Sequence, residues 1–305
     1  MTMTAIQQAM ERVPFIVNPV AGHGRGARAI PLIERILSER GLEGKFWVTQ
    51  RPDEATGIAK SLVQRDARII VVVGGDGTVQ EVANATIGTD TALGIVPAGS
   101  GDDFVKALGI PKEIPTALDM ALGGSVQIID VGRIDERYFV NAVGIGFDAM
   151  VGAEKEKAVF FRGFGAYLWG LLKTFFRYRS PVMRICFGDQ QIERKILMAT
   201  IGNGTCCGGG FYLTPDAVLD DGLLDVCVVR HLSRFKLLWH LPKVLKGTHT
   251  GLDEVTMAQC RAITVESDVP LMIHADGEIW PEKPTRVDIE LVPKALKVVV
   301  PHRLA

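Results

Sequence analysis

Short apolar runs alternate with segments of helical spacing in the first part of the chain. Val13 to Val17 and Arg68 to Val73 are rich in apolar, β-branched residues, a pattern typical of buried strands. Ala27 to Arg40 has apolar residues at helical spacing and is followed by Gly41, a common helix terminator. Strands that are apolar on both faces and alternate with helices predict a parallel sheet covered by helices. The same pattern predicts strands at Lys45 to Thr49 and Leu93 to Pro97, and helices at Asp53 to Arg65 and Thr78 to Ile87.

The pattern changes after about Asp130 to many short β-rich segments, which predict a β-sandwich. Two helical insertions interrupt them, near Glu154 to Arg177 and near Ser233 to Leu245. We therefore expect an α/β domain with a parallel sheet at residues 1–130, a β-sandwich domain at residues 131–305, and a cleft between the two. The predicted strands of the second half are Val126 to Ile134, Tyr138 to Gly144, Lys195 to Ile201, Leu224 to Val229, Ile263 to Glu266, Val287 to Val292 and Leu296 to Val300.

Composition supports two domains and narrows the class of protein. The chain has 305 residues, 47% of them hydrophobic, which is enough for two cores without disulfides. The 34 basic and 35 acidic side chains nearly cancel, so we expect no nucleic-acid partner. The five cysteines are scattered, with no C-x-x-C pair, and we interpret them as reduced thiols. The polar N-terminus has no apolar signal region, so we expect a cytoplasmic protein.

The strongest local signal for chemistry is the segment from Val71 to Thr78. It is a buried strand that ends in Gly74 and Gly75 and leads directly into a helix, so backbone amides there can approach phosphate closely. Asp76 lies in this loop, where its carboxylate would repel phosphate unless a divalent cation lies between them or it accepts a proton from the acceptor. A turn with an acidic helix cap is the alternative interpretation. The loop is not a Walker A motif, because no lysine follows the glycines.

Two other glycine-rich loops follow predicted strands. Asn18 to Gly26 precedes a helix and can present amides to an anion, although it also suits a flexible connection or a dinucleotide loop. A dinucleotide loop calls for an acid at the end of the next strand, and that strand ends in Thr49, Gln50 and Arg51. Pro97 to Phe104 adds a hydroxyl and two carboxylates. Ligands bind at the carboxyl ends of parallel strands, so we expect these loops to lie at one edge of the sheet.

The segment from His274 to Glu278 places another acid beside a glycine, at the end of a β-rich segment. A tight turn there would aim Glu278 at the expected cleft.

At these positions the chain resembles the diacylglycerol kinase catalytic-domain family of lipid kinases, which includes bacterial diacylglycerol kinases and the sphingosine and ceramide kinases. The resemblance runs over almost the whole chain, and four motifs in the family's order carry it. Any one of them alone would be unspecific. The motifs are Asn18-Pro19-x-x-Gly22, Gly74-Gly75-Asp76-Gly77-Thr78, Pro97-x-Gly99-Ser100 ending in Asp103-Phe104, and Asp276-Gly277-Glu278.

The resemblance implies a kinase that uses ATP and Mg²⁺ to phosphorylate a hydroxyl of diacylglycerol or a related lipid. It implies Glu278 as the general base and Asp76 as the metal-linked organiser of the phosphates, or the two roles reversed, as sphingosine kinases suggest. It also implies a structural Mg²⁺ held by Asp221 and by the backbone carbonyls of Val218 and Leu223, with an ion-free Asp-Gly turn as the alternative. The implied nucleotide-binding residues are Asn18, Pro19, Gly22, Thr49, Gly74, Gly75, Asp76, Gly77, Thr78 and Ser100.

The third loop departs from the family pattern. Ser100 replaces the usual threonine and keeps its hydroxyl, whereas Asp102 replaces the usual asparagine and adds negative charge near the phosphates.

Other functions stay open at this stage. NAD kinases share the Gly-Gly-Asp-Gly loop and a two-domain plan. An NADP-dependent oxidoreductase could use the loop from Gly22 to Gly26. A non-catalytic lipid or nucleotide binder is the third alternative, and it would need neither Asp76 nor Glu278. The Asp276-Gly277-Glu278 motif and the Asp221 loop favour a lipid acceptor, and the presence of both Asp76 and Glu278 favours an enzyme.

Two apolar helical stripes suit a lipid partner. Phe164 to Phe176 and Phe235 to Leu245 each carry apolar residues at helical spacing beside basic residues, as helices at anionic bilayers do. Arg162 and Lys173 argue against a membrane-spanning helix in the first region. We expect peripheral, transient contact with a membrane surface, the alternative being that both stripes pack on the sandwich. A homodimer is compatible with the sequence.

Overall fold

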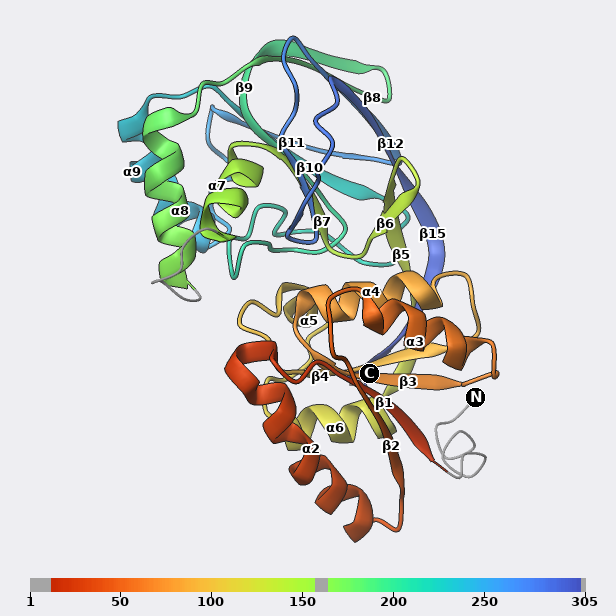
Figure 1. Ribbon diagram of the computed structural model, residues 1–305. Coiled ribbons are helices and arrows are strands. Elements are labelled where there is room, and N and C mark those ends of the chain that lie inside the picture. Colours follow the sequence, from red (N-terminus) through yellow and green to blue (C-terminus); the bar gives the residue numbers. More distant parts are fainter. Residues whose placement is uncertain (1–11, 157–163, 303–305) are drawn as a thin grey trace. The chain divides into compact units, whose positions relative to one another are not determined.

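The computed structural model describes residues 12–156 and 164–302, which form two compact units (Figure 1). Unit 1 holds the described residues up to Ile129 together with those from Lys294 onwards, and unit 2 is Asp130–Pro293. The sequence-based division assigned everything after residue 130 to the second domain. The C-terminal segment instead returns to unit 1, because Val298 pairs in parallel with Leu93.

Unit 1 is built on a parallel sheet in the order β2-β1-β3-β4-β15. Every residue of β1, β3 and β4 is buried, as expected for apolar strands covered on both faces. The strands are β1 (Val13–Val17), β2 (Gly44–Val48), β3 (Ile69–Gly74), β4 (Ala92–Pro97) and the C-terminal part of β15 (Arg286–Val300).

Helices cover both faces of this sheet. In Figure 1, α3 and α4 lie together on one face, whereas α2 and α6 lie on the other. The first turn of α2 is distorted, because Gly22, His23 and Gly24 have left-handed backbone angles. The helices are α2 (Ala21–Glu39), α3 (Glu54–Val63), α4 (Asp76–Thr86), α5 (Asp103–Ala107) and α6 (Ile114–Gly123).

The strand order places three loops at the same edge of the sheet. The chain runs from β1 through α2 to β2 on one side of β1, and then crosses to β3 on the other side. Such a reversal of direction leaves space at the carboxyl ends of the strands, where open α/β sheets bind ligands. The segments after β1, β3 and β4 are the three glycine-rich loops identified in the sequence.

Unit 2 is a sandwich of antiparallel strands, and the predicted fold class is confirmed. One layer contains β8, β12, the first part of β9 and the first part of β15, and the other contains β14, β13, β7, the second part of β9, β10 and β11. The long strand β9 belongs to both layers. The strands are β5 (Ser125–Ile134), β6 (Arg137–Phe139), β7 (Ala142–Gly146), β8 (Val182–Phe187), β9 (Gln190–Gly202), β10 (Leu224–Arg230), β11 (Val255–Cys260), β12 (Ala262–Ser267), β13 (Ile273–Ala275) and β14 (Glu278–Ile279).

Two apolar clusters hold unit 2 together. The larger one lies between the sandwich layers and includes the fully buried residues Phe139, Ile185 and Val265. The second lies on the outer face of the β7-β9-β10 layer, where three helices cover it. These helices are α7 (Phe147–Glu156), α8 (Phe164–Arg177) and α9 (Arg234–Leu245).

The structure differs from the predicted elements in several respects. The predicted strand from Tyr138 to Gly144 is divided between β6 and β7. Val287 to Val292 and Leu296 to Val300 were expected to be separate strands, but both belong to β15, which bends at Lys294 with φ of 51° as the chain passes from unit 2 to unit 1. The sequence analysis did not predict helices α5 and α6 or strands β8, β11 and β14. Residues 157–163 of the first predicted helical insertion, Arg162 among them, lie outside the described residues. Within the described parts of the chain, no helix is long and apolar enough to cross a membrane.

Candidate functional site

The first two glycine-rich loops are joined by a side-chain hydrogen bond. Asn18 follows β1, and its Nδ2 donates to Oγ1 of Thr78 in the first turn of α4 at 3.0 Å. The Asn18 Oδ1 accepts from the amide of Val20, so the same side chain also shapes its own loop. Thr78 is 4% exposed and lies beneath the loop surface. Asn18 and Thr78 therefore have a structural role in fixing the two loops against each other, whatever they contact in a ligand.

Close backbone packing joins the third loop to the other two. Gly22 has φ of 51°, and a Cβ there would lie 2.0 Å from the carbonyl oxygen of Ala98. A Cβ on Gly99 would lie 2.6 Å from Cα of Gly75. No side chain fits at either contact, so these glycines are required for the loops to approach. Arg25 adds a hydrogen bond from Nη1 to the carbonyl oxygen of Gly99 at 3.4 Å.

Asp76 ties the second loop to the third. Its Oδ2 accepts from the amide of Asp102 and its Oδ1 from the amide of Asp103, both at 2.8 Å, with a longer bond of 3.4 Å from Phe104. Burial of the carboxyl, followed by the like charges of Asp103 and Asp102, raises the pKa of Asp76 to about 6, although the amide bonds oppose this shift. The side chain thus caps the N-terminus of α5, an arrangement that sequence reasoning did not identify.

Asp102, the position that departs from the family pattern, is a buried acid with left-handed backbone. Its φ is 53°, its side chain is 1% exposed, and neither carboxylate oxygen has a well-aligned hydrogen-bond partner among the described residues. Lys112 Nζ lies 3.8 Å from Oδ2. Burial raises the pKa of Asp102, against the opposing charges of Lys112 and Arg25. An uncharged side chain of the same shape, such as asparagine, would suit this environment better than a carboxylate does.

The other predicted nucleotide residues surround these contacts. Thr49 follows β2, is 7% exposed, and directs its hydroxyl to the carbonyl of Val17 at 3.4 Å. Ser100 is exposed at the tip of the third loop. Pro19 and Gly77 are half-buried in the first and second loops. The predicted residues of unit 1 therefore cluster at the carboxyl edge of its sheet.

In unit 2, Asp276 holds the hairpin that carries Glu278. The Asp276 carboxylate accepts hydrogen bonds of 2.7–2.9 Å from the consecutive amides of Val140, Asn141 and Ala142. Burial raises the pKa of Asp276, and these amides oppose the shift. Asp276 has φ of 49°, and Ala275 pairs with Glu278 across the turn. Glu278 itself is exposed. The two acids of the motif thus differ in position: one anchors the turn and the other projects from it.

The predicted metal loop begins at Val218 and leads into β10, which starts at Leu224. Asp221 Oδ1 accepts from the amide of Leu223 at 2.9 Å, and the amide of Gly222 donates to Oδ2 of Asp130 at 2.7 Å. Burial raises the pKa of Asp225, with the negative charges of Asp221 and Asp216 adding to the shift. No cluster of three His, Cys, Asp or Glu side chains suited to a metal occurs in the described residues.

The donor set of this loop nevertheless fits Mg²⁺ chemically. Asp221 offers a carboxylate, and Val218 and Leu223 offer backbone carbonyls, which are hard oxygen donors. A divalent cation would also offset the repulsion that Asp221 exerts on Asp225.

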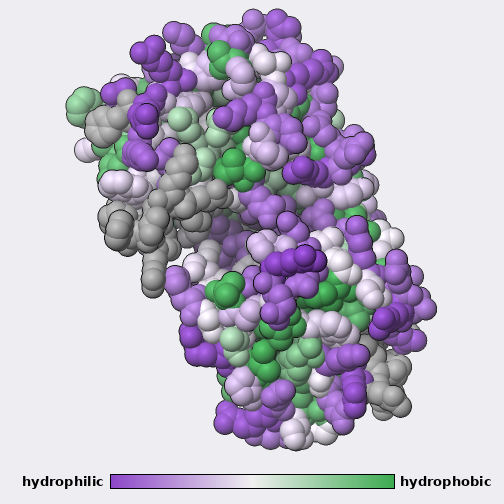
Figure 2. All heavy atoms as spheres, in the orientation of Figure 1, coloured by the Kyte–Doolittle hydropathy of each residue, from purple (hydrophilic) through white to green (hydrophobic). Residues whose placement is uncertain are grey.

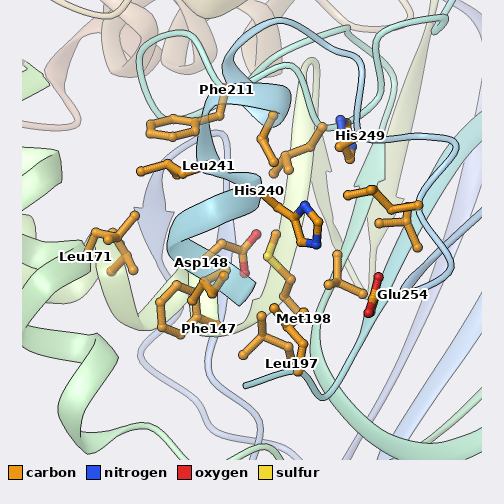
Figure 3. Close-up of a pocket in the computed structure, with 18 residues that line it drawn as sticks. Phe147, Asp148, Leu171, Leu197, Met198, Phe211, His240, Leu241, His249 and Glu254 are labelled. Carbon is orange, nitrogen blue, oxygen red and sulfur yellow. The ribbon is translucent and has the colours of Figure 1, made fainter. Parts of the chain in front are cut away.

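Sequence reasoning missed an apolar cavity in unit 2, about 80 Å³ in volume, beneath α9 (Figure 3). Apolar residues of α7, α8, α9, β9 and β10 form most of its wall, among them Phe147, Leu171 and Leu241. Figure 3 shows the carboxylate of Asp148 and the ring of His240 among these apolar side chains. Only the tertiary structure brings these segments together, so no local signal could have indicated the cavity.

A buried polar group lies at the wall of this cavity. Asp148 Oδ2 accepts from Oγ1 of Thr200 at 3.2 Å and lies 3.5 Å from Nε2 of His274 on β13. A Cβ on Gly144 would come within 2.1 Å of that oxygen and 2.2 Å of that nitrogen, so only glycine fits beside the pair. The contact between Asp148 and His274 connects the cavity wall to β13, the strand that precedes the Asp276 turn.

Family comparisons agree with this arrangement of motifs. Residues 12–134 match the model described as the diacylglycerol kinase catalytic domain, and residues 141–300 match the YegS C-terminal NAD kinase beta sandwich-like domain. A diacylglycerol kinase of Mycobacterium tuberculosis is 32% identical over 298 residues, covering 95% of this chain and 96% of the relative. The chain belongs to the diacylglycerol kinase family. It is a lipid kinase, and the resemblance deduced from its motifs is confirmed.

One further relative supports the assignment, and a solved structure shares the fold. A probable lipid kinase YegS-like protein of Chromohalobacter salexigens is 33% identical over 238 residues, or 76% of each chain. A crystal structure described as a diacylglycerol kinase from Bacillus anthracis superposes with a TM-score of 0.72 at 21% identity, covering 96% of this chain and 97% of the other. The latter likeness concerns the fold alone.

Proposed function

We propose that this lipid kinase transfers the γ-phosphoryl group of ATP, in the presence of Mg²⁺, to a hydroxyl of diacylglycerol or a related lipid. The observation that carries the proposal is the union of three glycine-rich loops at one edge of a parallel sheet. The Asn18–Thr78 bond and the amide bonds to Asp76 fix their relative positions. Phosphoryl transfer depends mostly on such positioning and on neutralisation of charge, because the protein has little covalent chemistry to perform.

Asp76 contributes in two ways under this proposal. Its carboxylate holds the amides of Asp102 and Asp103, so it sets the shape of the third loop. With a pKa of about 6 it is mostly ionised at neutral pH and can be linked to the phosphates through a cation. Bound Mg²⁺ would neutralise charge on the transferred phosphoryl group. The glycine loops of unit 1 would bind the nucleotide.

Glu278 is proposed as the general base, with the reverse assignment to Asp76 as the alternative. A base must present its carboxylate to the acceptor hydroxyl, and Glu278 projects from a short hairpin whose backbone Asp276 anchors. Asp276 is unsuited to that role, because both its oxygens accept backbone amides. In the same unit, Asp221 with the carbonyls of Val218 and Leu223 would hold a structural Mg²⁺.

The acceptor is proposed to place part of an acyl chain in the apolar cavity of unit 2. Its wall is largely aliphatic and aromatic, which suits a hydrocarbon and not a dinucleotide. This feature favours a lipid over NAD, the acceptor of the related two-domain NAD kinases.

A direct test is transfer of labelled γ-phosphate from ATP with Mg²⁺ to a panel of acceptors in mixed micelles. The panel contains diacylglycerol, phosphatidylglycerol, a sphingoid base, an isoprenoid alcohol and NAD. We expect label in the organic phase, with diacylglycerol as the preferred acceptor. Label on NAD alone, or no transfer with ATP, would refute the proposal.

A further inference from the structure

Helix α9 presents large apolar side chains to solvent. The exposed fractions are 86% for Phe235, 78% for Trp239 and 41% for Leu238. Their spacing of three and four residues places them on one stripe of the helix. Helix α9 lies at the edge of unit 2 (Figure 1), and the visible surface at this edge mixes hydrophobic and hydrophilic residues (Figure 2). Aromatic side chains bury about 150–250 Å² each when covered, so this stripe can supply substantial binding free energy.

A second apolar stripe on the same helix is already used in the fold. Leu237, Leu241 and Val244 line the cavity and pack against the cluster on the outer face of the sandwich. Amphipathic helices on soluble proteins normally have a single apolar face. In α9 the inward stripe explains how the helix attaches to unit 2, whereas no contact among the described residues explains the outward stripe.

The segment that carries the outward stripe has basic but no acidic side chains. The segment from His231 to Gly251 contains four Lys and Arg residues and no Asp or Glu, in a chain whose net charge is −1. Lys236 is paired with Glu254 at 2.7 Å, but Lys243 and Lys246 have no ion pair among the described residues. A helix with exposed Trp and Phe and excess Lys is the composition that binds anionic bilayers.

The cavity indicates why a bilayer is the partner that fits. An apolar cavity of about 150 Å³ holds one benzene molecule. The cavity beneath α9, at about 80 Å³, can admit only a short segment of an acyl chain. A long-chain acceptor would therefore keep most of its hydrocarbon in the membrane while its hydroxyl is phosphorylated. The membrane must then lie against this helix.

We infer that α9 docks the enzyme on an anionic bilayer, inserting Phe235 and Trp239 among the lipids while Lys243 and Lys246 contact the headgroups. The cavity wall, formed by the opposite stripe of the same helix, then lies at the membrane surface. This inference rests on the proposed function, because it takes the acceptor to be a bilayer lipid.

Vesicle binding without nucleotide tests the inference independently of turnover. Vesicles of phosphatidylcholine are compared with vesicles of equal parts phosphatidylcholine and phosphatidylglycerol, by cosedimentation. We expect binding to the anionic vesicles only. The double variant Phe235→Ala/Trp239→Ala should bind at least about tenfold more weakly, and so should Lys243→Glu/Lys246→Glu. The matched controls, Val269→Ala at an exposed apolar position of unit 2 and Lys60→Glu on α3, should bind as the wild type does.

Brominated phosphatidylglycerol gives a second readout. It should quench the fluorescence of Trp239, and the conservative variant Trp239→Phe should lose this quenching while keeping most of the affinity. Unchanged affinity of the double aromatic variant, with a thermal midpoint equal to that of the wild type, would overturn the inference. So would a wild-type dimer in the absence of lipid that the same variant converts to a monomer, because the stripe would then be a protein interface.

A short-chain diacylglycerol dispersed as monomers separates the two proposals. Phosphorylation of this acceptor without any binding to anionic vesicles would support the proposed function and refute docking by α9. Vesicle binding without phosphorylation of any lipid would refute the proposed function and leave a membrane-binding helix. The double aromatic variant should phosphorylate the monomeric acceptor at the wild-type rate and lose turnover only on vesicles.

Discussion

The backbone amide of Asp103 donates a 2.8 Å hydrogen bond to the carboxylate of Asp76, so the acid of the second glycine loop fixes the end of the third, where α5 begins. The neighbouring amide of Asp102 makes an equivalent bond to the other carboxylate oxygen. A residue that appears in the sequence as a candidate for phosphate or metal chemistry is therefore also the structural link between two loops. Changes at this position should affect both turnover and stability.

Asp76→Ala is expected to lower turnover at least about 100-fold, because it removes both a charge near the phosphates and the acceptor of the third-loop amides. Asp76→Asn is the matched variant, which keeps the side-chain volume and one acceptor oxygen. Labelled-phosphate transfer to diacylglycerol measures both. Alanine turnover within tenfold of the wild type would remove Asp76 from the mechanism.

The raised pKa of Asp76 predicts a pH dependence of stability. Its folded pKa of about 6 exceeds the ordinary value of 3.8, so between these values the folded protein binds a proton that the unfolded chain has released. The free energy of unfolding therefore falls as pH rises through this window. The full decrease in the free energy of unfolding, on the order of 2–3 kcal/mol, is present above pH 6.

The Asp76→Asn side chain cannot ionise, so the variant does not undergo this pH-dependent decrease in the free energy of unfolding. The difference in thermal midpoint between the variant and the wild type should shift in the variant's favour as pH rises from about 4 to about 7. Scanning calorimetry at steps of pH measures it. A difference that does not change with pH would show that Asp76 has an ordinary pKa.

Asp102→Asn is expected to stabilise unit 1, because the wild-type carboxylate is buried without a well-aligned hydrogen-bond partner among the described residues and its pKa is raised. An increase in the thermal midpoint of roughly 2–4 °C at neutral pH is expected for each kcal/mol gained. Asp103→Asn is the control, since it breaks the 2.8 Å ion pair with Lys106 and should not stabilise. A lower midpoint for Asp102→Asn would mean that the charge at position 102 is compensated.

Substitution of Asp276 should mainly lower stability, whereas substitution of Glu278 should mainly lower turnover. Asp276→Ala leaves three backbone amides without their acceptor and should lower the free energy of unfolding by about 2–4 kcal/mol. Glu278→Ala removes an exposed side chain, so the thermal midpoint should stay close to the wild-type value while turnover is abolished. Calorimetry and the transfer assay together measure this contrast. Full activity of Glu278→Ala would exclude it as the base.

Asp221→Ala should abolish stabilisation by Mg²⁺. A ligand at about 100 times its dissociation constant stabilises the folded state by about 2.7 kcal/mol, so Mg²⁺ should raise the thermal midpoint of the wild type relative to chelator. The variant should lose this increment, whereas Asp220→Ala, which changes the neighbouring exposed acid, should keep it. An equal response to Mg²⁺ in wild type and Asp221→Ala would favour an Asp-Gly turn without an ion.

Much of the fold could be predicted because its signals are local. Val13–Val17 was expected as a strand and is one, since a run of five apolar residues before a glycine-rich loop has few other solutions. Strand β8 was not identified, because every position except Arg184 is apolar and the sequence hides the regular alternation of burial. Strand β11 was not identified, because only Cys260 in it is buried. The return of Val298 to the first unit could not be predicted, because pairing with Leu93 depends on residues some two hundred positions apart.

The sequence by itself determined the family, the order of the motifs and the chemical types at the site, because these are properties of short segments. The tertiary structure decided what each motif residue does. It assigned Asp76 to the amides of the third loop and Asp276 to those of residues 140–142, so that Glu278 alone projects from its motif. It also decided which apolar stripe of α9 packs inward and which, with Phe235 and Trp239, faces solvent. Helical spacing reveals that a stripe exists, but only the packing of neighbouring elements determines whether it is covered.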